Sequence, residues 1–297
     1  MKIGFIGIGS IGLPMAKRLR AAGHHLVVAD TNATALHAFV ADGGTAAANP
    51  REVGDQVEIV FYSLPTPQVV REVTLGPDGV AAGTRARIIV DLSTTGPSAA
   101  IPIGRAALER GKQMMDAPVS GGVAGAAEGR LAIMVSGPSR DFDEIKPLLD
   151  VIGKVFYVGS EVGQGHTMKL LNNILSATSI AATTEVMALG VKAGLDAAVM
   201  IDVLNASSGQ NTATKDKYPR SILNRKFNYG FRTDLLLKDV RLCKAFADEM
   251  GVNLRVGEAV IKTWELAEPQ YANADYTNLV KVLESEAGVI IGKEQTS

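Results

Sequence analysis

Residues 2–12, KIGFIGIGSIG, decide the fold of the first half of the chain. Residues 2–6 form an apolar run typical of a buried strand, and the spacing G-x-G-x-x-G follows at the start of a predicted helix over residues 12–22. The first glycine of this pattern permits a tight turn, the second lets the backbone approach a pyrophosphate, and the third allows close packing of helix on strand. The helix N-terminus also presents free N–H groups to an anion. We therefore expect a dinucleotide to bind at Gly7, Ile8, Gly9, Ser10, Ile11 and Gly12.

An acidic residue stands at the end of the second predicted strand, residues 26–29. Asp30 lies 18 residues beyond Gly12, close to the ~20 expected for an acid that binds the ribose of a dinucleotide. A carboxylate accepts hydrogen bonds from a ribose 2′-OH and repels a 2′-phosphate, so Asp30 favours NAD over NADP. The alternative is that Asp30 only caps the helix that begins near Thr31.

The first half of the chain alternates short β-rich runs with amphipathic stretches. Strands are predicted at residues 2–6, 26–29, 57–64, 87–92, 113–116, 131–135 and 155–158, and helices at 12–22, 33–42, 97–110 and 141–152. This alternation is typical of parallel βαβ units in a sheet covered on both faces. Residues 1–162 are thus expected to form a doubly wound, Rossmann-type dinucleotide-binding domain of the α/β class.

The character of the sequence changes after Gly159. Residues 168–193 are rich in Ala, Leu and Met and contain no Pro, which predicts a long helix; further helices are predicted at 196–205, 235–250, 254–268 and 275–289. We expect residues 163–297 to form an all-α domain, joined to the first by the long helix, that serves substrate binding and oligomerisation.

Bulk composition is that of an ordinary globular protein. The chain has 297 residues, 46% hydrophobic and 21% charged, and a formal net charge of -1. We expect no nucleic-acid partner and no secretory segment. We also expect no membrane span, since no apolar stretch approaches the ~18 residues that a span needs. Cys243 is the single cysteine, and the four histidines show no metal-ligand spacing, so we expect a cytoplasmic protein without a metal site.

The stretch DAPVSGG, residues 116–122, ends a predicted strand with a Ser-Gly-Gly turn. Backbone N–H groups at Ser120, Gly121 and Gly122 can gather into a concave anion site suited to a carboxylate. An ordinary strand-to-helix loop is an equally good interpretation of the spacing.

The stretch GQGHTMK, residues 163–169, leads into the long helix. Lys169 and Asn173 are four residues apart and share a helix face. Most lysines are solvated, but the apolar neighbours of Lys169 argue for a buried one. Hydride chemistry at a carbinol needs a group that accepts a proton on oxidation and donates it on reduction, and a desolvated lysine can do both. His166 is interpreted as a helix-start residue; Lys238 and Asp239 are expected to open a later helix, where Asp239 could cap and Lys238 reach cofactor or substrate.

Together these motifs resemble the β-hydroxyacid dehydrogenases, which include 3-hydroxyisobutyrate dehydrogenase. The resemblance covers the whole chain and rests on residues 5–9, 15–16, 116–122, 163–173 and 238–239. It implies an NAD-dependent oxidoreductase in which Lys169 is the general acid/base, Ser120, Gly121, Gly122 and Asn173 bind the substrate, and Leu64, Pro65, Thr94 and Lys238 contact the cofactor. It also implies a homodimer or homotetramer.

Residues 204–209, LNASSG, look more like 3-hydroxyisobutyrate dehydrogenases than tartronate semialdehyde reductases. We therefore expect oxidation of a short 3-hydroxy acid to its semialdehyde, the partner being a small carboxylate-bearing hydroxy acid or semialdehyde. A tartronate or succinic semialdehyde or glyoxylate reductase of the same family is the alternative, and a non-catalytic NAD-binding protein a weaker one. Imine reductases share the architecture, but Lys169 argues against them.

Overall fold

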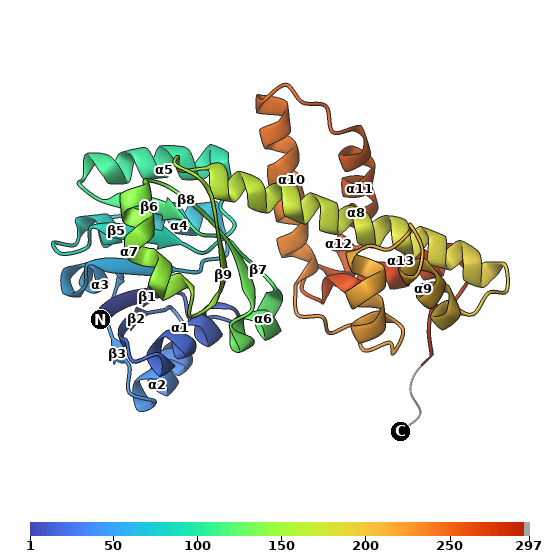
Figure 1. Cartoon of the computed structure of the whole chain (residues 1–297), viewed down its shortest axis with the longest axis horizontal. Helices are drawn as coiled ribbons and strands as arrows, with labels where there is room; N and C mark the ends of the chain where they lie inside the picture. Colours follow the sequence, from blue (N-terminus) through green and yellow to red (C-terminus); the bar gives the residue numbers. More distant parts are fainter. Residues whose placement is uncertain (294–297) are drawn as a thin grey trace. The chain divides into compact units, whose positions relative to one another are not determined.

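The computed structural model describes residues 1–293 (Figure 1). The chain divides into two compact units, the first Met1–Lys169 and the second beginning at Leu170. Helix α8 (Gln164–Lys192) runs through the division. The α/β class and the helical second half are as predicted, and each unit is described by itself.

The first unit is built on one mixed sheet with strand order β3-β2-β1-β4-β5-β6-β8-β7 and β9 paired to β8. Strand β1 pairs in parallel with both β2 and β4, so the strands that follow β1 lie on both sides of it. A crevice for a ligand is expected where strand order reverses in this way, at the carboxyl ends of the strands. The strands are β1 (Lys2–Ile6), β2 (His25–Ala29), β3 (Thr45–Ala46), β4 (Ile59–Tyr62), β5 (Ile88–Asp91), β6 (Gln113–Asp116), β7 (Val119–Ser120), β8 (Leu131–Ser136) and β9 (Gly153–Gly159).

Helices pack on both faces of this sheet. Neighbouring strand residues point to opposite faces: Phe5 belongs to a core that includes Met15 and Leu148, whereas Ile6 belongs to one that includes Val53. The doubly wound arrangement is therefore confirmed. The helices of this unit before α8 are α1 (Gly12–Ala21), α2 (Ala33–Ala41), α3 (Pro50–Gln56), α4 (Pro67–Leu75), η1 (Val80–Ala82), α5 (Pro97–Glu109), α6 (Gly122–Glu128) and α7 (Ser139–Leu149).

The sheet departs from the prediction in one respect and contains elements that were not predicted. Strand β8 runs antiparallel to β6 and β7, with Asp116 opposite Ser136, so the sheet is not wholly parallel. Strands β3 and β7 have two residues each, and α3, α4 and α6 have seven to nine. Strands of two residues and helices of seven carry too little periodicity to be recognised from hydrophobic spacing. The nine-residue α4 has the same length as α2, which was predicted, so its length does not explain why it was missed.

The second unit is helical. After α8 come α9 (Ala197–Asn205), the π-helix η2 (Ala213–Ile222), α10 (Thr233–Glu249), α11 (Arg255–Glu265), α12 (Glu268–Tyr271), η3 (Tyr276–Asn278) and α13 (Leu279–Ala287). The buried Trp264 of α11 donates a hydrogen bond from Nε1 to the Ala177 carbonyl oxygen of α8 at 3.1 Å. This bond ties the long helix to the centre of the unit. The π-helix, which contains Pro219, was not predicted.

Helix α8 corrects the expectation that no apolar stretch reaches membrane-span length. It has 29 residues and is apolar enough, by length and composition, to cross a membrane. Its Ile174, Ala177 and Ile180 lie in the hydrophobic core of the second unit. Core helices of soluble proteins can have the same length and apolar composition, so these two properties of α8 are weak evidence for a membrane span.

Candidate active site

The glycine-rich loop has the shape that a dinucleotide requires. Gly7 has φ +85°, and a Cβ there would lie 2.3 Å from the Ser63 carbonyl oxygen. A Cβ on Gly12 would lie 1.9 Å from the Gly7 carbonyl oxygen, whereas one on Gly9 would meet nothing within 4 Å. Gly7 and Gly12 are therefore required by the fold, and Gly9 leaves the backbone open to a ligand. These residues fit the pyrophosphate of NAD.

Asp30 lies directly beside this loop. Its Oδ2 accepts a hydrogen bond from the Ile8 backbone N–H at 2.7 Å, and its Oδ1 accepts one from the Asn32 backbone N–H at 2.7 Å. The N-cap of α2 is Asn32, whose side chain accepts from the Ala35 N–H at 3.1 Å. The alternative in which Asp30 itself caps the helix is therefore wrong. Its carboxylate is held against the loop, where a ribose-binding acid is expected.

Three of the residues predicted to contact the cofactor follow two neighbouring strands. Leu64 and Pro65 come after β4 and Thr94 after β5, and these strands are paired at Tyr62 and Asp91. The Leu64 backbone N–H donates to the Ser93 hydroxyl at 2.9 Å. The fold thus brings the two segments together at the sheet edge where β1 ends.

The Ser-Gly-Gly turn connects β7 to α6. Gly121 and Gly122 have φ values of +138° and +66°, and a Cβ on Gly122 would meet nothing within 4 Å. Ser120 ends β7 and Gly122 begins α6, so Gly121 alone connects the strand to the helix, and the backbone of Gly122 is open on one side. An anion that approaches from that side can therefore reach the Gly122 backbone.

Lys169 lies on the second turn of α8, and its side chain is buried at 7% exposure. Burial excludes the interpretation of a solvated surface lysine. The exposed residues beside it are apolar, Met168 at 40% and Leu171 at 45%.

Three fully buried ionisable residues meet just before Lys169. Nε2 of His166 lies 3.2 Å from Oδ2 of Asp91 and 3.5 Å from Oδ1 of Asp116, and all three side chains are 0% exposed. Asp91 ends β5, Asp116 ends β6 and His166 lies in the first turn of α8. Within residues 1–293, no group of three or more His, Cys, Asp or Glu side chains is arranged to hold a metal ion. Because both carboxylates lie within ion-pair distance of His166, we call these three side chains an ion-pair network.

The two carboxylates of this network differ in acidity. Burial would raise the pKa of Asp91, but the charge of His166 and hydrogen bonds from His166, Thr95 and Ser93 outweigh it, and the pKa lies below its ordinary value. Burial dominates at Asp116, and the charge of His166 with hydrogen bonds from Ser136 and Gly163 offsets it only in part, so that pKa is raised. Asp91 therefore keeps its negative charge to a lower pH than Asp116 does.

The sequence held a signal for this network. Asp91 is the second-last residue of the strand predicted at 87–92, and Asp116 is the last residue of the strand predicted at 113–116. The ends of neighbouring parallel strands meet at one sheet edge. His166 does lie at a helix start, as interpreted, but its burial between two carboxylates was not foreseen.

In the second unit, Asn173 and Lys238 meet at Asp239. The Asn173 side-chain amide donates to Oδ2 of Asp239 at 2.6 Å, and Nζ of Lys238 lies 2.9 Å from Oδ1. Helix α10 begins at Thr233, so the expectation that Lys238 and Asp239 open it, with Asp239 as a cap, is wrong. Asp239 instead joins α10 to α8.

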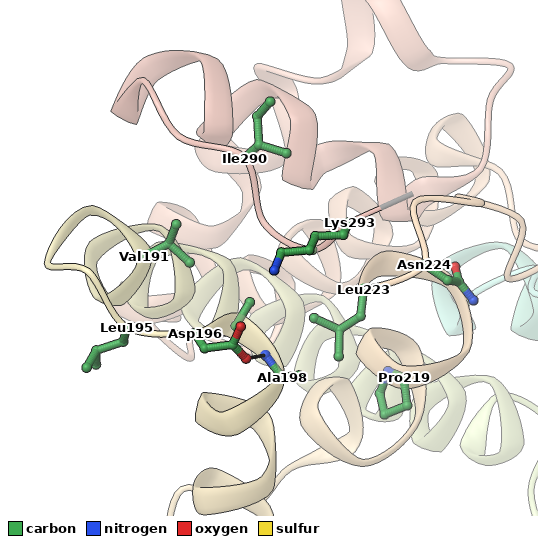
Figure 2. A pocket seen from close by; sticks show the side chains of 11 residues that line it. Val191, Leu195, Asp196, Ala198, Pro219, Leu223, Asn224, Ile290 and Lys293 are labelled. Atoms are coloured by element: carbon green, nitrogen blue, oxygen red, sulfur yellow. Dashed lines mark hydrogen bonds between the residues drawn. The ribbon is translucent and has the colours of Figure 1, made fainter. Parts of the chain in front are cut away.

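The second unit also contains a cavity of about 500 Å³, shown in Figure 2. Its lining is largely apolar, with Asp196 and Lys293 as charged members. Asp196 caps α9 by accepting from the Ala198 and Val199 N–H groups at 2.9 and 3.1 Å. The cavity contains no predicted site residue, and its carboxylate is already used in capping.

We expect Asp91→Asn to destabilise the fold by about 3 kcal/mol at pH 7, and Asp116→Asn by clearly less. The lowered pKa of Asp91 means that its ionised form favours folding; this contribution is present above the ordinary value of 3.8 and is lost as the pH falls through the lower folded-state pKa. The raised pKa of Asp116 has the opposite sign, because its ionisation opposes folding at neutral pH. Urea unfolding at pH 7 measures the free energy of unfolding of both variants. Equal losses, or a larger one for Asp116→Asn, would contradict the assignment.

Comparisons with known proteins agree with this geometry. Residues 2–159 match the family model described as the NAD binding domain of 6-phosphogluconate dehydrogenase. Residues 163–283 match that described as NAD-binding of NADP-dependent 3-hydroxyisobutyrate dehydrogenase. The two matches together cover most of both units.

Individual relatives match over nearly their whole length. The chain is 35% identical over 297 residues to 2-(hydroxymethyl)glutarate dehydrogenase of Eubacterium barkeri, covering 99% of both chains. It is 36% identical over 299 residues to NAD-dependent L-serine dehydrogenase of Pseudomonas aeruginosa, covering 97% of this chain and 99% of the relative. The solved structure of Mycobacterium tuberculosis 3-hydroxyisobutyrate dehydrogenase with L-serine has a TM-score of 0.87 at 30% identity, covering 95% of this chain and 98% of the other. The chain belongs to the β-hydroxyacid dehydrogenase family and is an NAD(P)-dependent oxidoreductase.

Proposed function

We propose that this enzyme reversibly oxidises a short 3-hydroxy acid, such as 3-hydroxyisobutyrate, to its semialdehyde, with Lys169 as general acid/base. The observation that carries the proposal is the burial of Lys169, at 7% exposure, on a helix whose first turn is bonded to the carboxyl ends of β5 and β6. The glycine loop follows β1 at the same edge of the same sheet. A proton carrier and a dinucleotide loop thus share one edge.

The names of the relatives support a narrower substrate class. The relatives are named for 2-(hydroxymethyl)glutarate, L-serine and 3-hydroxyisobutyrate. All three compounds are 3-hydroxypropionates with a substituent at carbon 2: carboxyethyl, ammonium or methyl. We infer that this enzyme acts on the shared HO–CH₂–CH(R)–COO⁻ unit, and that its pocket selects the substituent R.

Each site residue has a place in this reaction. NAD, when bound, supplies the acceptor for the hydride that leaves carbon 3. The neutral Lys169 amine takes the hydroxyl proton on oxidation, and the ammonium returns it on reduction. Ser120, Gly121 and Gly122 hold the carboxylate through hydroxyl and backbone N–H groups, and Asn173 orients the substrate. Leu64, Pro65 and Thr94 line the nicotinamide side, and Lys238 lies near the cofactor.

A substrate panel tests the proposal. We expect NADH to form with at least one of 3-hydroxyisobutyrate, L-serine and 2-(hydroxymethyl)glutarate, and not with lactate, which lacks the 3-hydroxyl group. Absorbance at the NADH band gives kcat/KM for each compound. Faster reduction of glyoxylate, tartronate semialdehyde or succinic semialdehyde than oxidation of every 3-hydroxy acid would favour the alternative reductase. No turnover of any compound would contradict the proposal.

The cofactor preference follows from Asp30. We expect kcat/KM with NAD to exceed that with NADP by at least ~10-fold, or about 1.4 kcal/mol, because the carboxylate beside the loop repels a 2′-phosphate. Asp30→Asn, which keeps an acceptor for the Ile8 N–H, should narrow the ratio. Asp42→Asn, at the exposed C-cap of α2, should leave it unchanged. A wild-type preference for NADP would overturn the role of Asp30.

We also propose that the enzyme forms a homodimer or homotetramer in the cytoplasm. Exposed large apolar side chains along α8 support assembly: Leu175 at 67%, Val186 at 50% and Leu189 at 71% exposure. Apolar surface of this kind is typical of protein interfaces.

A further inference from the structure

Lys169 follows a buried network that the proposed reaction does not use. We propose that His166 is a positioning residue: held between Asp91 and Asp116, it fixes the first turn of α8 and thereby the place of the Lys169 amine. The inference rests on the proposed function, because it takes Lys169 as the proton carrier. His166 itself contacts neither substrate nor cofactor in this scheme.

Both carboxylates that hold His166 are themselves fixed. Asp91 accepts from the Ser93 backbone N–H at 2.8 Å and from the Thr95 hydroxyl at 2.6 Å. Asp116 accepts from the Ser136 hydroxyl of β8 at 2.9 Å. Neither carboxylate can follow the imidazole if the helix moves, so the network holds α8 to β5 and β6.

The backbone of the first turn of α8 is bonded to the same groups. The Gly163 and His166 N–H groups lie 2.6 and 3.4 Å from Oδ2 of Asp116, and the Gly165 N–H donates to the Ser136 hydroxyl at 2.8 Å. Such N–H groups have no partner within a helix, and here β6 and β8 provide it. A Cβ on Gly165 would lie 2.5 Å from the Met134 carbonyl oxygen. The start of α8 therefore packs directly against the sheet.

Charge balance gives His166 a role that an apolar residue cannot fill. Two carboxylates buried at 0% exposure repel each other and favour a cation between them. The neighbouring Tyr62 provides no charge to balance the carboxylates. Burial, followed by the charges of Asp91 and Asp116, raises the pKa of its phenol well above its usual range, so the phenol stays neutral. The His166 imidazole lies within ion-pair distance of both carboxylates and stabilises them when protonated.

Less than one helical turn separates Lys169 from His166 of the network. Lys169 lies three residues after His166, and a helix repeats every 3.6 residues. A shift of the first turn therefore carries the amine with it. A misplacement of about 1 Å can cost ~10²-fold in rate.

A double-mutant cycle tests the proposal. We compare kcat of the full-length wild type, His166→Ala, Lys169→Ala and the double variant, with 3-hydroxyisobutyrate and NAD or the best substrate of the panel. His166→Ala is expected to lose ~10²-fold in kcat with NADH affinity within about twofold. In the Lys169→Ala background the same substitution should cost almost nothing, because a residue that acts through Lys169 has nothing left to position. His37→Ala, at an exposed position of α2, is the matched control and should match wild type.

A conservative variant separates positioning from a merely structural role. His166→Gln can donate to the carboxylates without a charge and should recover part of kcat, leaving a loss of about tenfold. If His166→Ala does not fold, His166→Gln is put through the same cycle and judged by the same criterion.

Each contrary outcome has its own meaning. An equal loss from the His166 substitution in both backgrounds, or wild-type kcat in the His166 variant, overturns the positioning role and leaves Lys169 as the base. Near-normal kcat in Lys169→Ala overturns the proposed function and, with it, this inference.

Discussion

Lys169→Ala is expected to lose ~10²–10⁴-fold in kcat, the usual contribution of general acid-base catalysis, while its affinity for NADH is kept. The reason is the place of the amine: it is buried at 7% exposure on α8, and the dinucleotide loop is formed by other residues. Removing the side chain deletes the proton acceptor and leaves the loop intact. Steady-state kinetics and NADH fluorescence titration measure the two quantities separately.

Two further lysine variants sharpen this prediction. Lys169→Arg keeps the positive charge but cannot exchange a proton near neutral pH, so it should be nearly as impaired as Lys169→Ala. Lys192→Ala, at the last residue of the same helix, should retain wild-type kcat. A Lys169→Arg enzyme with high turnover would mean that the position needs only charge, and a Lys169→Ala enzyme with normal turnover would remove Lys169 from the chemistry.

Gly12→Ala is expected to destabilise the fold by about 3 kcal/mol and to abolish measurable NADH binding. A Cβ there would lie 1.9 Å from the Gly7 carbonyl oxygen, a backbone atom that cannot move without opening the turn. Helix α1 would then shift away from β1, and its N-terminus would no longer face the pyrophosphate. Urea unfolding and NADH titration measure the two losses.

Gly9→Ala is the matched variant in the same loop. A Cβ on Gly9 meets no protein atom within 4 Å, so stability should change by less than about 1 kcal/mol. The methyl group would occupy the space through which the pyrophosphate reaches the backbone. NADH affinity should therefore fall at least ~10-fold. Unchanged affinity in Gly9→Ala would contradict the placement of the dinucleotide.

The dinucleotide half could be predicted from sequence because its signals are local. Strand β1, the three glycines and Asp30 lie within thirty consecutive residues. The spacing between them along the chain is enough to indicate their roles. The two-residue strands β3 and β7 and the antiparallel direction of β8 could not be predicted, because they depend on pairing between distant segments.

The candidate site divides in the same way. A buried lysine could be expected from the apolar residues beside Lys169, whereas the contacts of His166 with Asp91 and Asp116 join positions 75 and 50 residues apart. The sequence predicts a capping role for Asp239 at the start of a helix, but α10 begins at Thr233, so Asp239 lies within the helix, where it accepts a hydrogen bond from Asn173. Side-chain partners across elements follow from the fold and not from spacing.

The pH dependence of kcat/KM for hydroxy-acid oxidation, measured in wild type and in Lys169→Ala, tests the central claim most directly, because it reports the ionisation of the free enzyme's essential base. We predict that wild-type kcat/KM rises with pH as the Lys169 amine loses its proton, and that this limb is absent from the residual activity of Lys169→Ala. The same rising limb in both enzymes would show that another group removes the proton.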